Sequence, residues 1–290
     1  MDNSHNPYAK ALDGLKIKNP VKSFFAFCIE REKIRKKRQH GLPKPWTDDE
    51  IFKNARFLNV FREDDRGSKA ILRFANNLND DLETLIQALF FARWCNRQET
   101  LDLLSSDILS DPEELLHLMQ GKESWCNTTA YPVESIYWEG KKYSRVDAAT
   151  ILFFKIKKYL ADIIQRSEGN IIRATNSVNK HFKMQNDFPI FMAITDIAWF
   201  RPDIISPASP VPTGIGAVAF LDRLQSYLGT DSHESTCDKM IELQKEYWPD
   251  AKRTFHPIDI EYLSCECRKY YSYINKTKLF EGKNIFIPKF

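Results

Sequence analysis

The sequence has few glycines and no apolar run long enough to cross a membrane. Only 10 of its 290 residues are Gly, which excludes collagen-like and glycine-rich low-complexity chains. The longest apolar stretch, 188–200, contains Asp196 and falls short of the roughly 20 residues that a membrane span needs. The first residues are polar and lack the apolar region of a signal peptide. We therefore expect a soluble, cytoplasmic protein with no membrane partner.

The short motifs of several enzyme classes are also missing. There is no Gly-x4-Gly-Lys-Ser/Thr, which excludes a P-loop kinase, and there is no His-Glu-x-x-His or Gly-x-Ser-x-Gly. The histidines have no partner at the spacing of metal ligands, and the six cysteines form no Cys-x-x-Cys pair. We expect reduced thiols, no metal and no cofactor.

Charge is distributed unevenly along the chain. The net charge is +3, but residues 1–75 hold 17 Lys and Arg against 10 Asp and Glu. The remaining residues carry a small acidic excess. A basic first quarter on a near-neutral body indicates a localised anionic partner.

Helical periodicity dominates the chain and predicts a mainly α fold. Regular alternation of strands and helices is absent, so a parallel-sheet nucleotide-binding fold is excluded. At most a small β-hairpin is expected near 133–143, with Gly140 in its turn. We expect one helical domain over 21–280, possibly in two lobes around a DNA cleft, between tails 1–20 and 281–290. The expected helices are 21–39, 47–62, 68–78, 81–95, 113–119, 146–166, 171–182, 189–200, 217–228, 236–247 and 257–274.

The first segment with chemical interest is strongly basic, with six cations in the eight residues 31–38. Clustered cations that neutralise DNA phosphates give salt-sensitive binding, mostly without sequence preference. A solvated helix end that complements the helix dipole is the alternative. The predicted DNA contacts are Arg31, Arg35, Lys36, Lys37 and Arg38.

The second segment follows a capping box at Thr47–Glu50, which predicts a helix through about Arg62. Asn59 and Arg62 are three residues apart and would share one helical face. Together with Arg66 they are candidates to hold a phosphate, with Asp65 orienting an Arg. An ion-paired helix end explains the same pattern.

The third segment, Gly214-Ile-Gly-Ala217, fits a dinucleotide-binding fingerprint but follows a proline-rich stretch instead of a strand, so a Rossmann site is rejected. A turn of this kind can still offer the amides of Gly214 and Gly216 to a phosphate, as helix-hairpin-helix motifs do. An ordinary loop before a helix is equally consistent with the sequence.

The last candidates are carboxylates and one lysine. Asp259, Glu266 and Lys269 are spaced to lie near one another on a helix, where a carboxylate beside a lysine can transfer protons or bind an amine. A surface ion pair is the commoner explanation. Asp196 lies in an otherwise apolar helix, where burial would raise its pKa and suit a general base. A cap or a buried ion pair is the alternative there.

These segments occur in an order that resembles one family. The sequence is similar to the bacteriophage α-glutamyl/putrescinyl-thymine pyrophosphorylases, or amino acid:DNA transferases, over residues 25–275. The helical domain that accompanies phage 5-hydroxymethyluridine DNA kinases shares the pattern. The chain departs from it at Asp187–Phe191, where a Gly-Pro-Phe-like turn is usual, and at Tyr262, where His is common.

The resemblance implies a helical fold derived from helix-hairpin-helix DNA glycosylases and a role in thymine hypermodification of phage DNA. The substrate would be double-stranded DNA carrying 5-pyrophosphoryloxymethyluracil, made by a DNA kinase of the same pathway. An amino acid or polyamine would replace the pyrophosphate after the base is flipped. Arg62 and Arg66 would stabilise the leaving group, and Asp196, Glu266 or Asp259 would be the base. A DNA glycosylase and a non-catalytic DNA-binding partner of the kinase remain alternatives.

Overall fold

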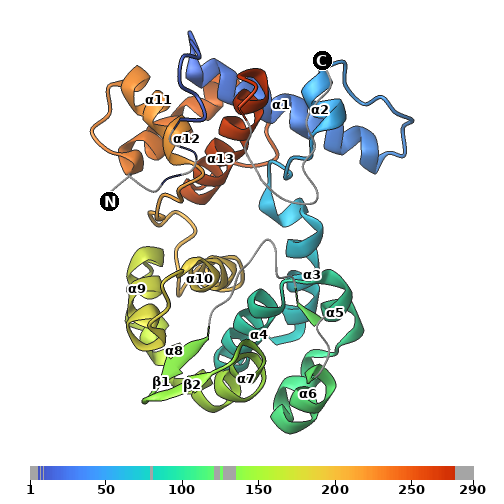
Figure 1. Ribbon diagram of the computed structural model, residues 1–290, viewed down its shortest axis with the longest axis vertical. Coiled ribbons are helices and arrows are strands. Elements are labelled where there is room, and N and C mark those ends of the chain that lie inside the picture. The colour runs from blue at the N-terminus through green and yellow to red at the C-terminus, as the bar shows by residue number, and fades with distance from the viewer. Residues whose placement is uncertain are drawn as a thin grey trace. The chain divides into compact units, whose positions relative to one another are not determined.

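The structure, a computed structural model, describes residues 6, 8, 10–78, 81–120, 125–126 and 135–277. It is mostly helical, and one two-stranded antiparallel sheet is present in this part of the chain (Figure 1). The expected fold class is therefore confirmed. Within the same residues, no helix is both long and apolar enough to cross a membrane.

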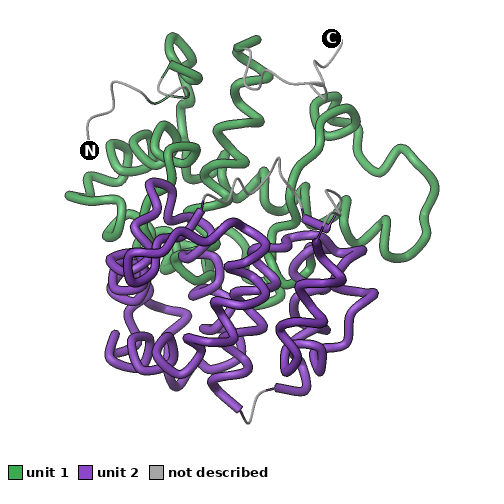
Figure 2. Tube along the Cα trace, turned by 60° about the horizontal axis from the view of Figure 1, so that its bottom comes forward, with its two compact units in different colours: residues 1–64, 211–290 green, residues 65–210 purple. Residues whose placement is uncertain are grey.

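The chain divides into two compact units (Figure 2). Unit 1 combines residues 1–64 with residues 211–290, and unit 2 is the continuous stretch 65–210. Unit 1 contains α1 (Pro20–Gln39), α2 (Glu50–Asn54), the 3-10 turn η2 (Arg62–Asp64), α11 (Val218–Leu228), α12 (His233–Tyr247) and α13 (Pro257–Ile274).

The core of unit 1 is built where α1 packs against α11, α12 and α13. Asn19 caps α1 by accepting a hydrogen bond from the Lys22 amide, and Pro20 occupies the first turn, where a missing amide costs nothing. The buried face of α1 presents Phe24 and Phe25, which contact the ring of Phe255. Ala11 and Leu12, in the stretch expected as a tail, are buried in this unit.

Unit 2 is organised around α4 (Leu82–Cys95), which packs on α8 (Phe153–Gln165) and α10 (Phe188–Phe200). Strands β1 (Ile136–Trp138) and β2 (Lys141–Tyr143) form the expected hairpin, although residues 133 and 134 of the expected range lie outside the described residues. The other elements of this unit are α3 (Arg66–Ala75), η3 (Asn76–Leu78), α5 (Gln98–Leu103), η4 (Ser106–Ser110), α6 (Pro112–Met119), α7 (Arg145–Asp147), the π-helical η6 (Ala148–Leu152) and α9 (Ile171–Phe182).

The expected helix over 47–62 is wrong. Asp49, and not Thr47, caps α2, because its carboxylate accepts hydrogen bonds from the amides of Ile51 and Phe52. The helix ends at Asn54, and Ala55 is already extended. The chain then leaves the helix because its next backbone groups bind side chains of α1 and α13, as described below.

Candidate active site

Helix α13 carries three of the predicted site residues and binds the non-helical segment 55–61 of the same unit. The Glu266 carboxylate accepts a 2.9 Å hydrogen bond from the Leu58 amide. The Lys269 ammonium lies 3.7 Å from that carboxylate and donates to the Arg56 carbonyl. Glu266 and Lys269 thus come together as predicted, but their contacts fix a loop.

Arg31 supports the same segment from α1. Its side chain is only 6% exposed, and its guanidinium donates to the Leu58 carbonyl at 2.8 Å and to Oδ1 of Asn59 at 2.6 Å. Asn59 in turn donates 2.9 Å to the Asp64 carbonyl. Asn59 and Arg62 do not share a helical face, since Asn59 lies in the non-helical segment before η2. The sequence predicted that Arg31 binds DNA and that Asn59 binds a phosphate. In the structure, both side chains form hydrogen bonds within the protein.

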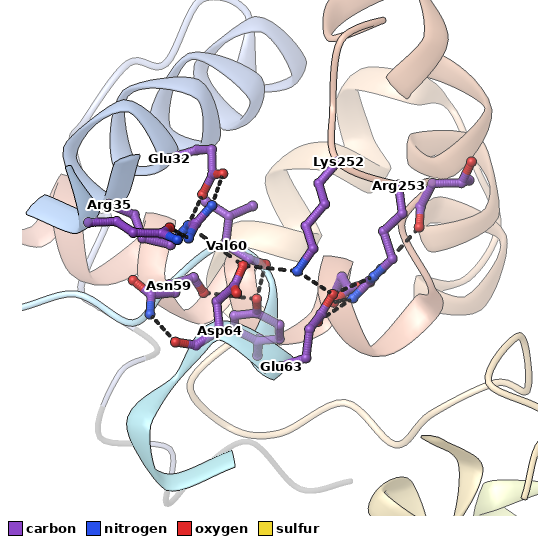
Figure 3. Close-up of polar contacts among 12 residues, drawn as sticks. Glu32, Arg35, Asn59, Val60, Glu63, Asp64, Lys252 and Arg253 are labelled. Carbon is purple, nitrogen blue, oxygen red and sulfur yellow. Dashed lines mark hydrogen bonds and ion pairs between the residues drawn. The ribbon is translucent and has the colours of Figure 1, made fainter. Parts of the chain in front are cut away.

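A network of charges then ties α1, η2 and the start of α13 together (Figure 3). Arg35 forms a bidentate pair with Glu32, with both distances under 2.8 Å, and lies 3.6 Å from Asp64. Arg253 bridges Glu63 at 3.0 Å and Asp259 at 2.6 Å.

The buried Asp259 also accepts a 2.8 Å hydrogen bond from the His256 amide, which caps α13. Burial disfavours the charged form of Arg253, but the hydrogen bonds that its guanidinium donates to Asp259 and Glu63 outweigh this effect and raise its pKa. Asp259 and Arg35 are therefore parts of an ion-pair network, whereas Glu266 is paired with Lys269.

The glycine turn before α11 is fastened to α13. The Gly214 amide donates a 2.9 Å hydrogen bond to Oε1 of Glu261, and the Arg268 guanidinium donates 3.0 Å to the Gly216 carbonyl. A Cβ at position 216 would lie 2.6 Å from Sγ of Cys265, so only Gly fits this approach. The start of α11 after this turn is as predicted, but the Gly214 amide already has a carboxylate acceptor instead of an open position for phosphate.

The residue before this turn is fixed by a second chain of hydrogen bonds. The hydroxyl of Thr213 lies 3.2 Å from Nδ1 of His233, and Nε2 of the same ring lies 2.8 Å from the Asp222 carboxylate. These contacts attach the turn to α11 and α12 as well as to α13, so its backbone is held from three helices.

Glu261 is the most perturbed carboxylate at this turn. It is 8% exposed, and burial raises its pKa to about 7, against the opposing effects of the Gly214 hydrogen bond and the charge of Arg62. The Arg62 guanidinium lies 5.5 Å from the centre of the Tyr262 ring. It makes no hydrogen bond or ion pair with any residue that the structure describes, including Asp65, so it is free to meet an anion.

Arg268 adds a second cation beside the glycine turn. Its side chain is 1% exposed, and its Nη1 atom has no hydrogen-bond partner among the described residues. Sequence reasoning missed Glu261 and Arg268, which stand seven residues apart on one face of α13. Their spacing places them on one face of the helix, but the sequence does not show that the Gly214–Gly216 turn covers this face.

The other predicted site residues belong to unit 2. Asp196 forms a buried, bidentate ion pair with Arg93, with one contact of 2.6 Å. The sequence suggested either a general base or a buried ion pair for Asp196. The structure has the ion pair, because the Arg93 guanidinium binds the carboxylate. Asp65 is at the N-cap of α3, and Arg66 is exposed and donates 3.1 Å to Gln98.

The cations at the C-terminal end of α1 are exposed and form no ion pair with the described residues. Lys36, Lys37 and Arg38 project to solvent, and Lys37 donates 2.7 Å to the Trp46 carbonyl. The Arg38 guanidinium lies 5.3 Å from the centre of the Trp46 ring. In the described part of the chain, no group of three or more His, Cys, Asp or Glu side chains is arranged to hold a metal ion.

Comparison with known proteins gives one match. Residues 18–278 match a family described as 5-hmdU DNA kinase, helical domain. No curated protein and no solved structure matches the chain. The matched range covers nearly all the described residues of both units, including α1 and α13, which build the site. The chain therefore belongs to the family of the 5-hmdU DNA kinase helical domain.

Proposed function

We propose that this chain is a DNA base-modifying enzyme of thymine hypermodification. It replaces the pyrophosphate of 5-pyrophosphoryloxymethyluracil in DNA with the amine of an amino acid or polyamine. The observation that carries the proposal is the buried Glu261 carboxylate, bound by the Gly214 amide and under the electrostatic influence of an Arg62 guanidinium that makes no hydrogen bond or ion pair with the described residues. Family membership supports the pathway.

The reaction needs a proton acceptor and a stabiliser of negative charge. A new C–N bond forms as the C–O bond to pyrophosphate breaks, and the pyrophosphate leaves with the bonding electrons. The amine loses one proton, and a carboxylate with a pKa near 7 can accept it at neutral pH. Arg62 presents a planar fork of donors to the departing phosphate oxygens. In this proposal Glu261 takes the role of base that the sequence assigned to Asp196, Glu266 or Asp259.

DNA is held through its phosphates by the exposed cations at the end of α1. Lys36, Lys37 and Arg38 make no ion pair within the described residues, so their charge is available. The partners in this proposal are double-stranded DNA, a small amine and a DNA kinase that supplies the activated base.

Mass spectrometry of nucleosides digested from treated DNA tests the proposal. Duplex DNA carrying the pyrophosphorylated base is incubated with the protein and pooled amino acids and polyamines. We expect an amine adduct with the wild type and with Glu242→Gln, an exposed control on α12, and a large loss of adduct with Glu261→Gln. A folded wild type that forms no adduct contradicts the proposal.

A non-catalytic DNA-binding module is the second candidate, because the matched family is described as one domain of a kinase. The same experiment separates it from the enzyme. Unchanged nucleosides in DNA that the protein nevertheless binds identify a module, and release of a free base identifies a glycosylase.

A further inference from the structure

A cavity of about 490 Å³ lies in unit 1 between the end of α1, the segment around Trp46, and α2 with the residues that follow it. Its size is within the range of roughly 300–1,000 Å³ that is typical of small-molecule sites. Its walls combine cations and aromatic rings. We call it the Trp46 pocket and define it by Arg38, Lys44, Trp46, Phe52, Arg56 and Phe57.

The positive charge of the pocket is not neutralised from within the protein. Arg38, Lys44 and Arg56 form no ion pair in the described residues, whereas the neighbouring Lys53 is paired with Glu50 at 2.7 Å. The nearby Asp49 carboxylate is occupied, because it caps α2 and accepts a hydrogen bond from Tyr270. Three uncompensated cations around one cavity favour an anionic ligand.

The aromatic wall is held rigidly before any ligand binds. The Trp46 indole N–H donates 2.7 Å to the Leu42 carbonyl, and the Trp46 carbonyl accepts 2.7 Å from Lys37. Phe52 and Phe57 pack together with their ring centres 5.1 Å apart. A ring that is already fixed costs little entropy when a flat ligand stacks on it.

A flat ring that also carries phosphate fits these walls. Proteins bind single-stranded nucleic acid with aromatic rings that stack on bases and with cations that follow the backbone. The exposed Arg38 and Lys44 lie over the Trp46 ring, 5.3 and 5.1 Å from its centre, so a base stacks on the indole by displacing a cation, which then binds the phosphate of the same nucleotide. A base inside a duplex is covered on both faces by its neighbours, so a base presents a free face only when it is unpaired and out of the stack.

We infer that the Trp46 pocket binds one unpaired nucleotide of DNA, with the base beside the indole of Trp46 and the phosphate on Arg38, Lys44 and Arg56. The inference rests on the proposed function only in taking DNA as the ligand. It adds a nucleotide-binding site whose walls include neither Glu261 nor Arg62.

Fluorescence polarisation with two labelled duplexes tests it. One duplex has a single bulged thymidine, and the other has the same sequence without the bulge. The wild type should prefer the bulged duplex, and Trp46→Ala should reduce that preference on the order of tenfold, as loss of one stacking contact does elsewhere. Trp46→Phe should retain most of the preference, because it keeps an aromatic ring.

Matched variants separate the pocket from general charge effects. Lys44→Ala and Arg56→Ala should weaken the bulged duplex more than the perfect one. Lys245→Ala, an exposed cation on α12, should leave the ratio unchanged. Thermal melting of each variant verifies folding.

The outcomes distinguish this inference from the proposed function. A wild type that binds both duplexes equally, or a ratio that Trp46→Ala does not alter, overturns the pocket assignment alone. A wild type that binds no DNA overturns both. Thymidine 5′-monophosphate that binds with the same dependence on Trp46, without any preference for the bulge, assigns the pocket to a free nucleotide and overturns the inference.

Discussion

The backbone amide of Gly214 and the carboxylate of Glu261 are joined by a 2.9 Å hydrogen bond across 47 residues of sequence. The bond attaches the turn before α11 to the N-terminal part of α13, where the charge of Arg62 acts on the buried carboxylate. The effect of burial on the carboxylate is larger than the opposing effects of the hydrogen bond and of Arg62, so the pKa of Glu261 is raised to about 7.

Glu261 should make the stability of the protein fall as the pH rises from about 4.5 to about 7. Its folded pKa of about 7 lies above the ordinary 4.5, so the folded state holds the proton more tightly than the unfolded state in this window. At 1.36 kcal/mol per pKa unit, the loss is on the order of 3 kcal/mol. Denaturant unfolding of wild type and Glu261→Gln at pH 5 and pH 8 measures it. We expect a smaller difference between the two pH values in the variant, and equal differences would contradict the assignment.

Arg62→Lys should lower the turnover and leave the melting temperature nearly unchanged. The guanidinium stacks over Tyr262 but makes no hydrogen bond or ion pair with the described residues, so few stabilising contacts are lost. Removing one charge-stabilising donor costs about 2–4 kcal/mol of transition-state stabilisation in other enzymes. Single-turnover rates and thermal melting are measured on the same preparation. A normal rate rules out a catalytic role for Arg62.

Gly216→Ala should destabilise unit 1, because the added methyl would meet Cys265 Sγ at 2.6 Å. Gly67→Ala is the matched control, since no atom lies within 4 Å of its added Cβ and its backbone lies in α3. Thermal melting of both variants measures the effect. If the clash with Cys265 is the cause, the double variant Gly216→Ala with Cys265→Ala should recover part of the lost melting temperature. No recovery would indicate that the contact of the new methyl with Arg268, at 3.4 Å, is the cause.

Asp196→Asn should destabilise unit 2 by about 3–5 kcal/mol, because it leaves the buried Arg93 guanidinium without its charged partner. Replacing both residues with apolar ones, as Arg93→Met with Asp196→Leu, should recover most of the stability. Chemical denaturation of Arg93→Met, Asp196→Leu and the double variant measures the coupling. A stable Asp196→Asn protein that has lost only its activity would restore the catalytic role that the sequence suggested.

The end of α1 should bind DNA without reading its sequence. Replacing Lys36, Lys37 and Arg38 by Ala should weaken binding to unrelated sequences alike and flatten the dependence on salt, by about 0.9 in the logarithmic slope per lost phosphate contact. Arg35 is left in place because it is paired with Glu32. Lys33→Ala, at an exposed cation near Glu30, is the control. An unchanged slope in the triple variant would show that this helix end does not contact phosphate.

The helices were largely predictable from the sequence because their caps and apolar spacing are local. The bounds of α9 and α13 agree with the expected ranges, and the hairpin was found from its turn. The segment after Asn54 was not predictable, because its backbone is satisfied by Arg31 and Glu266, which are remote in sequence.

The site residues show the same limit. Glu266 and Lys269 were brought together as their spacing predicted, since one helix turn separates them. Arg93 opposite Asp196 and the turn opposite Glu261 come from other elements, and nothing local in the sequence indicates those partners. Burial by distant segments is what converts an ordinary carboxylate into a perturbed one.

Unit 1 is assembled from two stretches of chain that a whole second unit separates, and this sets an order of events during synthesis. Unit 2 is continuous and can complete its contacts as soon as it leaves the ribosome. Helix α1 emerges earlier, yet Phe24 and Phe25 pack on rings that are made only after unit 2, namely those of Phe220, Tyr247 and Phe255. Leu58 and Glu266, which are joined by a hydrogen bond, are 208 residues apart in sequence. The apolar face of α1 is therefore covered only after the whole of unit 2 has been made.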